Sequence, residues 1–299
     1  MISTSHHRHR LVHALRPLIA LAILGAAAAR GQSIDEAPST TFRAPSGLGV
    51  EFHHPIPDLI GDLISTERGA PELEASIPHD QWYSPATRKR FGVWGPLPRA
   101  YDPLPGLEGK PVDWKRERVI AAALRFQGYA YQHHHIPNWD PPADWPWLEV
   151  KEGKNGKGVD CSNFTSFVYN QAFGVRITSH VVRQSRLESV RKNPDDRSFS
   201  IRRIELPESY ERRIQALKTG DLLFIRGSVD SDITHVVIWV GSVGRSASGV
   251  PLVLDSHGAG VQDEEGRSIP DGVQLRPFRE KSWYNRCASH AFRIFDELP

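Results

Sequence analysis

The feature that most constrains this chain is the order of its C-terminal segments, in which two helical patterns are followed only by short β-strand patterns. The helical patterns run from Asp113 to Gly128 and from Cys161 to Gly174, and each ends at its glycine. The first is predicted to be an amphipathic helix with Asp113 as its cap. The strand patterns are rich in β-branched and aromatic residues and lie at 222–225, 235–241, 251–257, 273–278 and 290–295. Because no further helix separates these strands, the sequence predicts an α+β fold with an antiparallel sheet.

The N-terminus has the pattern of an export signal. Basic residues are followed by the apolar run 17–29, which is 13 residues long and therefore short of the ~20 that span a bilayer. Small residues precede an expected cleavage point between Gly31 and Gln32. The sequence thus predicts that residues 1–31 are a cleaved signal peptide and that the mature protein is periplasmic or extracellular, with no integral membrane span. An uncleaved membrane anchor is the alternative.

The charge balance argues against nucleic acid as a partner. The net charge of +2 includes four arginines in residues 1–31, and the remaining chain has 33 basic and 35 acidic residues. A nearly neutral mature chain lacks the basic surface that phosphate backbones require. The two cysteines also exclude a disulfide scaffold and a Cys-rich zinc ribbon.

Residues 32–112 differ in composition from the rest of the chain. They are rich in proline and aromatic residues and show no sustained helical period. We expect an irregular, Pro-rich N-terminal arm packed over the surface of a domain that spans 113–299, with one short helix at Ile56–Ile64.

Cys161 is the first candidate for chemistry. It opens a helix, where unpaired backbone N–H groups and the helix dipole favour a thiolate and can stabilise an oxyanion. Asp160 stands just before the first turn, where its side chain can accept from those N–H groups. The alternative is a buried structural cysteine.

His235 is the second candidate. It begins a buried strand directly after a polar loop, so its ring can be held rigidly beside a reactive group. A histidine next to a thiol forms the Cys/His pair of nucleophilic catalysis. The alternative is an ordinary residue at the end of a strand.

Four segments together resemble the NlpC-type cell-wall cysteine peptidases: GVDCSNFTSFVYNQAFG, LKTGDLLFI, ITHVVIWVGS and LVLDSHGAGV, in this order within residues 116–298. The resemblance implies a papain-like fold, in which a helix bearing Cys161 packs on an antiparallel sheet bearing His235. It also implies hydrolysis of peptide bonds in peptidoglycan stem peptides, typically between D-glutamate and a diamino acid, without a cofactor. Residues 113–299 would then be the catalytic domain.

The resemblance extends to residues around the cysteine. The segment GYAYQHHH is similar to a family segment that lines the active site, which implies that the hydroxyl of Tyr131 faces the nucleophile. Asp160 and Ser162 would lie in the vicinity of the substrate and the oxyanion. Asn163 departs from the glycine that the family usually has at this position.

A Cys/His pair needs a third polar group to orient the imidazole. Along the predicted strand 251–257, period-two alternation places Asp255 and His257 on the same face, where either can approach His235. Position relative to the family pattern favours Asp255, and residue type favours His257. We expect the catalytic set to be Cys161 and His235 with one of these two, and Asp255 is preferred.

Three other interpretations of the sequence are open: a metal site, an enzyme with another substrate, and a wall-binding module. His133, His134 and His135, with Asp140 nearby, have the composition of a metal site, but consecutive residues in an extended segment alternate in direction, so no metal site is predicted. The chain can also be an amidase or acyltransferase acting on another substrate, or a non-catalytic wall-binding module. Cys287 is predicted neither to act in catalysis nor to pair with Cys161, and the sequence gives no oligomeric state.

Overall fold

The computed structural model describes residues 39–44, 46–65, 84–86, 89, 101–131, 159–193, 195–258 and 260–295. The predicted signal peptide at 1–31 lies outside these ranges, as do His133, His134 and His135. In the described ranges, no helix has the length and apolar character needed to cross a bilayer.

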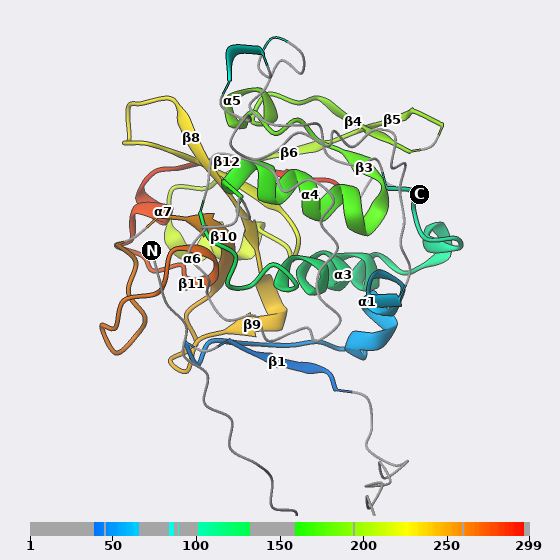
Figure 1. The fold of residues 1–299 in the computed structure, drawn as a ribbon. Coiled ribbons are helices and arrows are strands. Elements are labelled where there is room, and N and C mark those ends of the chain that lie inside the picture. The colour runs from blue at the N-terminus through cyan, green and yellow to red at the C-terminus, as the bar shows by residue number, and fades with distance from the viewer. Residues whose placement is uncertain are drawn as a thin grey trace, which may run out of the picture. The chain divides into compact units, whose positions relative to one another are not determined.

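A six-stranded antiparallel sheet, in the order β11-β10-β8-β7-β12-β6, organises the C-terminal part of the chain (Figure 1). Its strands are β6 (Arg202–Glu205), β7 (Leu222–Arg226), β8 (Ile233–Trp239), β10 (Leu252–His257), β11 (Gly272–Pro277) and β12 (Ala288–Arg293). All except β6 lie where the sequence predicts a strand, and the expected mixture of helices with antiparallel strands is confirmed.

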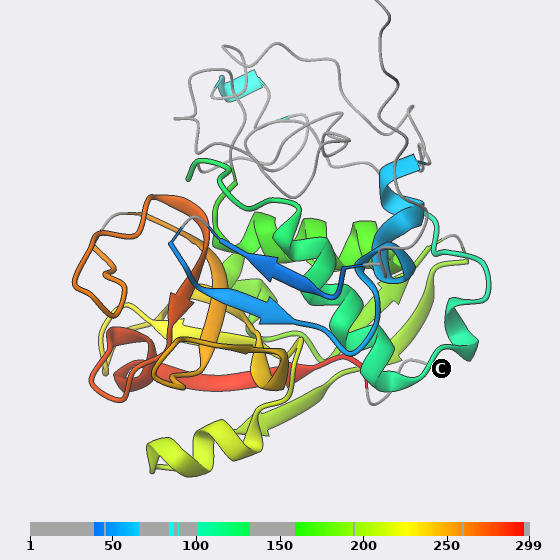
Figure 2. The ribbon, with the colours of Figure 1, turned by 90° about the horizontal axis from the view of Figure 1, so that it is seen from below.

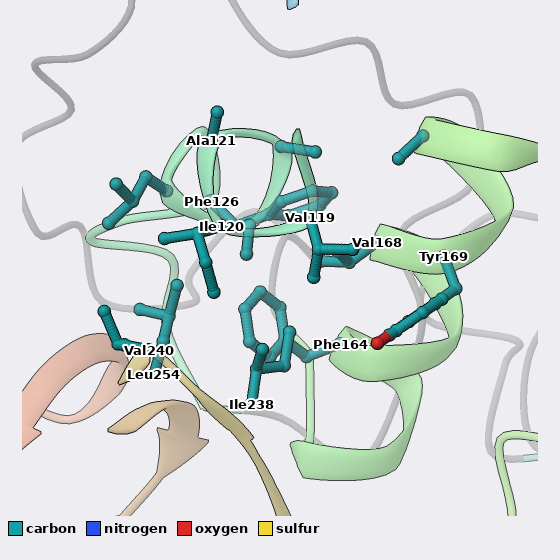
Figure 3. Packing of buried hydrophobic residues seen from close by; sticks show 14 of the residues in the cluster. Val119, Ile120, Ala121, Phe126, Phe164, Val168, Tyr169, Ile238, Val240 and Leu254 are labelled. Atoms are coloured by element: carbon teal, nitrogen blue, oxygen red, sulfur yellow. The ribbon is translucent and has the colours of Figure 1, made fainter. Parts of the chain in front are cut away.

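The two predicted helices form the layer that packs on this sheet. They are α3 (Val112–Leu124) and α4 (Cys161–Phe173), which contact each other, while α4 also contacts β8 and β10. Figure 3 shows the interior between them, where side chains of both helices meet Ile238, Val240 and Leu254 of the sheet side. A second apolar cluster includes Val237, Trp239 and Val253, which alternate with these core residues along the same strands.

The ends of α4 follow from two residues. Asp160 is the N-cap, and its carboxylate accepts a hydrogen bond from the backbone N–H of Asn163 at 2.8 Å. Gly174 ends the helix with a φ of 66°, and a Cβ at this position would lie 2.7 Å from the carbonyl oxygen of Tyr101. The helix expected to begin at Cys161 and end at Gly174 is therefore confirmed, and Cys161 is held in its first turn.

The other helix, α3, differs from the expectation. Its N-cap is Pro111 and not Asp113, which lies in the first turn, and the helix ends at Leu124 before a turn that reaches Gly128. Nearly every side chain of α3 is buried, so the helix has no solvent-exposed face. Its charged side chains must therefore find partners inside the protein.

Two of these side chains have partners in the segment 39–65, which contains β1 (Thr41–Arg43), β2 (Gly49–Glu51) and α1 (Ile56–Ser65). The carboxylate of Glu117 contacts Nδ1 of His53 at 2.6 Å and Nδ1 of His54 at 2.9 Å. The guanidinium of Arg118 binds the carboxylate of Asp62 at 2.7 Å. Two buried charges of α3 thus hold this segment in place.

The same segment also enters the hydrophobic core. The strand β2 pairs with β9 (Gly244–Arg245), and Figure 2 shows β1, β2 and α1 in blue against α3. The short helix expected at Ile56–Ile64 is observed, whereas the two strands were not predicted. Five side chains of the segment 39–65 are almost fully buried: Phe42, Val50, Phe52, Leu59 and Ile60.

Removing this segment is therefore expected to unfold the protein. Loss of each large buried side chain costs about 2–5 kcal/mol, and a domain has only about 5–15 kcal/mol in total. A chain that begins after Ser65 should show no cooperative thermal transition, whereas a chain that begins at Gln32 should show one. Calorimetry of the two chains checks this, and equal Tm values would contradict it.

The stretch 192–213 is rich in charged residues and lies outside the predicted helices and strands, but it contains β5 (Arg197–Ser200), β6 and the start of α6 (Tyr210–Ala216). With β3 (Val175–Arg176) and β4 (Ser189–Lys192), β5 forms a three-stranded sheet. In β5 only Phe199 is buried, so the charged residues face water and hide the strand pattern. The remaining short helices are η3 (Leu107–Gly109), α5 (Val181–Gln184), η4 (Gly241–Val243) and α7 (Trp283–Arg286).

The turn before β7 is held by a buried ion pair. Asp221 accepts from the backbone N–H of Lys218 at 2.9 Å and from the guanidinium of Arg293 at 2.7 Å. Gly220 has a φ of 85°, and its N–H bonds the carbonyl of Trp239 at the end of β8. The Gly-Asp pair therefore fixes β7 next to β8, the strand that carries His235.

Candidate active site

Cys161 lies in the first turn of α4 and is 5% exposed. Its Sγ is 4.0 Å from the carbonyl oxygen of Thr234, the residue before His235. The N-terminus of α4 therefore meets the start of β8, which brings the predicted nucleophile and base together.

His235 lies between Cys161 and Asp255. Its Nε2 is 2.7 Å from Oδ2 of Asp255, which lies on the neighbouring strand β10. Because an ionised carboxylate only accepts hydrogen bonds, Nε2 carries a proton, and Nδ1 is left for the hydrogen bond between His235 and Cys161. Thiol, imidazole and carboxylate thus form one chain of contacts.

Asp255 is fully buried and makes two further charge-assisted contacts. Nε of Arg276, on β11, donates to Oδ1 at 2.8 Å, and the hydroxyl of Tyr284, on α7, donates to Oδ2 at 2.8 Å. Burial raises the pKa of Asp255, but Arg276 and His235 outweigh it and lower the pKa to about 2. The carboxylate is therefore ionised at any physiological pH.

The same contacts set the charge of His235. Burial alone would lower its pKa, but the neighbouring sulfur of Cys161 and the hydrogen bond that His235 donates to Asp255 raise it to about 10. His235 is accordingly an imidazolium at neutral pH, flanked by the carboxylate and the sulfur.

This geometry is matched by a similarity in sequence, because residues 150–290 match the NlpC/P60 family model. This part of the chain is an NlpC/P60 domain. The NlpC/P60 family includes peptidoglycan hydrolases such as SagA. No curated protein matches the chain.

Two solved structures are similar to the chain. One is an NlpC/P60 family protein from Bacillus cereus ATCC 10987, with 17% identity over 64% of this chain and 41% of that chain, at a TM-score of 0.32. The other is the NlpC/p60 domain of the peptidoglycan hydrolase SagA, with 19% identity over 60% of this chain and 98% of that chain, at a TM-score of 0.31. The chain thus spans less than half the length of the first of them.

His257, the alternative partner for the imidazole, takes a different position in the NlpC/P60 domain. Its Nδ1 is 2.6 Å from the carbonyl oxygen of Gly258, so this nitrogen is the donor, and its ring meets that of His235 edge-on at 5.0 Å between centroids. Burial lowers the pKa of His257. The hydrogen bond to His235 is thus made by Asp255, while a neutral His257 packs against the same ring.

Two other predicted residues, Tyr131 and Ser162, lie near Cys161. Tyr131 forms a β-bridge with Val159 just before the NlpC/P60 cysteine helix, and burial together with the charges of Cys161 and Asp160 raises its pKa to about 12. Ser162 donates from Oγ to the carbonyl of Ser179 at 2.6 Å. Tyr131 and Ser162 therefore both lie beside the thiol, and Tyr131 stays protonated at neutral pH.

Asn163 stands where the family usually has glycine, and its side chain has a structural role. Its side-chain nitrogen donates to Oδ2 of Asp160 at 2.9 Å, while its backbone N–H donates to Oδ1. The carboxylate of Asp160 is thereby fully engaged in holding the first turn, so the structure gives it a capping position. No acceptor among the described residues takes the N–H groups of Cys161 and Ser162.

Three residues near His235 and Asp255 were not predicted from the sequence: Arg276, Trp283 and Tyr284. Trp283 lies 5.5 Å from the ring of His235 and 5.6 Å from that of His257, and its Nε1 donates to the carbonyl of Gly227. Arg276 stands between apolar residues in the strand pattern at 273–278, which is a signal for a buried carboxylate partner that the sequence already contains.

The expectation for Cys287 is confirmed where it concerns pairing, since both cysteines are free thiols. Cys287 is 6% exposed and belongs to the second apolar cluster with Tyr284 and Ala291. In the part of the chain that the structure covers, no three His, Cys, Asp or Glu side chains are grouped to hold a metal ion, and His133–His135 lie outside it.

Proposed function

We propose that this chain is an exported cysteine hydrolase that cleaves peptide bonds in peptidoglycan stem peptides, between a D-glutamyl residue and a diamino acid. The observation that supports the chemistry most is the line of contacts from Cys161 through His235 to Asp255. The NlpC/P60 match at 150–290 supports the class of substrate. Tyr131 and Ser162 would border the bound peptide.

In the proposed first step, the Cys161 thiolate attacks the carbonyl carbon of the scissile bond and forms a C–S bond, and the carbonyl electrons move to oxygen. The backbone N–H of Cys161, at the N-terminus of α4, stabilises this oxyanion. His235 then gives a proton to the leaving nitrogen as the C–N bond breaks, which leaves a thioester and a free amine.

In the proposed second step, water attacks the thioester carbonyl and neutral His235 accepts one of its protons. The C–S bond breaks, which releases the carboxylic acid and restores the thiolate and the imidazolium. Asp255 keeps Nε2 protonated throughout, so that the same nitrogen of His235 faces the sulfur in both steps.

The organisation of the chain is part of this proposal. Residues 1–31 would direct export and be removed, residues 32–112 would form the N-terminal arm, and 113–299 would be the catalytic domain. The packing of α4 on β8 and β10 supports a papain-like arrangement, with the nucleophile on a helix and the base on the sheet.

The test is incubation of the chain from Gln32 onward with a synthetic stem tetrapeptide, followed by mass spectrometry. We expect two products whose masses add up to the peptide plus one water, with the break after the D-glutamyl residue. An unchanged peptide that sediments with the protein on cell walls would favour the wall-binding module. Transfer of the acyl group to an added amine would favour the acyltransferase.

A further inference from the structure

A pocket of about 210 Å³ lies between α5 and the strands β6, β7, β8 and β12, and its lining includes Ile233, two residues before His235. Three arginines line it, each from a different element: Arg186 follows α5, Arg203 is on β6 and Arg226 is on β7. Neither the family match nor the proposed chemistry assigns a role to these residues. Their convergence on one pocket calls for a ligand of opposite charge.

The pocket is connected to the thiol through both of its walls. Ile233 lines it, and the carbonyl of the next residue, Thr234, is 4.0 Å from Sγ of Cys161. On the other side, α5 begins two residues after Ser179, whose carbonyl accepts the hydroxyl of Ser162. Two short stretches of chain, 233–234 and 179–182, therefore join the pocket lining to the surroundings of Cys161.

The positive charge of the pocket is only partly balanced. Arg203 pairs with Glu205, and Nη1 of Arg226 donates to the carbonyl of Ser231 at 3.0 Å. Asp232 is the one acidic residue on the pocket lining. Arg186 is exposed, and in the described part of the chain its guanidinium has neither a hydrogen bond nor an ion pair.

His290 shows the effect of this charge at the pocket wall. Burial and the charge of Arg203 lower its pKa to about 4, with Arg226 acting in the same direction. Its Nε2 is 2.9 Å from the carbonyl oxygen of Ser185, so the neutral ring donates there. The arginines, and not the histidine, therefore carry the positive charge that a ligand would meet.

We propose that this pocket binds a carboxylate of the substrate that lies next to the scissile bond, with Arg186 as its free guanidinium and Arg226 as its fixed one. The inference rests on the proposed function and specifies the substrate. Guanidinium groups match carboxylates in planar geometry and bind them with charge-assisted hydrogen bonds. A stem peptide offers two such groups, the α-carboxylate of a side-chain-linked D-glutamyl residue and the side-chain carboxylate of an acidic diamino acid.

The test measures binding of three peptides to the chain carrying Cys161→Ala, so that it does not depend on turnover. The peptides are the stem tetrapeptide with both carboxylates free and two analogues with one or the other carboxylate amidated. Each is titrated by calorimetry against the Cys161→Ala chain alone, with Arg186→Gln, and with Arg183→Gln. Arg183 is the matched control, because it is exposed on α5 and does not line the pocket.

We expect amidation of the recognised carboxylate to raise Kd about tenfold, as loss of one charge-assisted contact does. Arg186→Gln should raise Kd for the free peptide by the same factor and make the protein insensitive to that amidation, whereas Arg183→Gln should change neither. Equal effects of Arg186→Gln and Arg183→Gln on Kd would overturn the inference. So would an Arg186→Gln protein that is still weakened by the amidation, because the two losses would then be independent. Absence of binding by every peptide would overturn it as well. Cleavage of all three peptides at equal rates by the unmodified chain would overturn it and leave the proposed function standing.

Discussion

Cys161→Ala is expected to lower turnover of the stem peptide by at least about 10⁴-fold, because it removes the only atom that can form the acyl-enzyme in the proposed reaction. Cys161→Ser should be almost as inactive, because a serine hydroxyl is far less acidic than a thiol and is a much weaker nucleophile at neutral pH. The measurement is kcat/KM with the synthetic tetrapeptide, together with a thermal melt that shows each variant to be folded.

The second cysteine provides a matched control. Cys287 is as buried as Cys161, at 6% against 5% exposure, and it is also a free thiol. Cys287→Ala removes a sulfur from the second apolar cluster and should change stability slightly while it leaves turnover unchanged. A thiol-reactive probe should label the unmodified chain and Cys287→Ala, but not Cys161→Ala. Undiminished hydrolysis by Cys161→Ala would rule out the proposed mechanism.

Local sequence signals were sufficient wherever the structure depends on neighbours in the chain. Asp160 and Gly174 set the two ends of α4 by capping, and each acts within a few residues of its own position. The strand patterns of β7, β8 and β10 are visible because these strands are buried and so consist of consecutive apolar residues. The position of Cys161 opposite His235 follows from these elements.

Local signals failed where remote charges are paired. The periodicity of α3 suggested one exposed face, but Glu117 and Arg118 are buried against His53, His54 and Asp62, which lie more than 50 positions earlier in the sequence. A sequence pattern contains no information on such distant partners. For the same reason, the two strands of the segment 39–65 were missed, since β2 needs β9 to complete its pairing.

The choice between Asp255 and His257 also depended on remote residues. Alternation along β10 correctly placed both residues on the face that approaches His235, but it cannot tell which of them binds the imidazole. What distinguishes them is Arg276 on β11 and Tyr284 on α7, which hold the carboxylate against the imidazole. A histidine at position 255 would place a second ring next to a buried guanidinium, whereas an aspartate neutralises it.

Asp255→Asn is expected to reduce kcat/KM by about 10²–10⁴-fold, because an amide can present its NH₂ to Nε2 and thereby favour the wrong tautomer of His235. It should also move the alkaline limb of the pH–rate profile. His235 has a raised pKa of about 10, so it is protonated below that pH, and loss of the Asp255 charge lowers this pKa. The imidazolium then loses its proton at a lower pH, and activity should fall earlier as the pH rises.

The controls separate this role from stability. Asp255→Asn leaves the buried guanidinium of Arg276 without a counter-charge, which costs several kcal/mol, so rates must be measured well below the Tm of the variant. Tyr284→Phe removes one hydrogen bond from the same carboxylate and keeps its charge, so it should weaken activity modestly and barely move the alkaline limb. His257→Ala should likewise leave the limb in place, since that ring contacts His235 only by its edge. If His257→Ala moves the alkaline limb and Asp255→Asn does not, then His257 and not Asp255 orients the base.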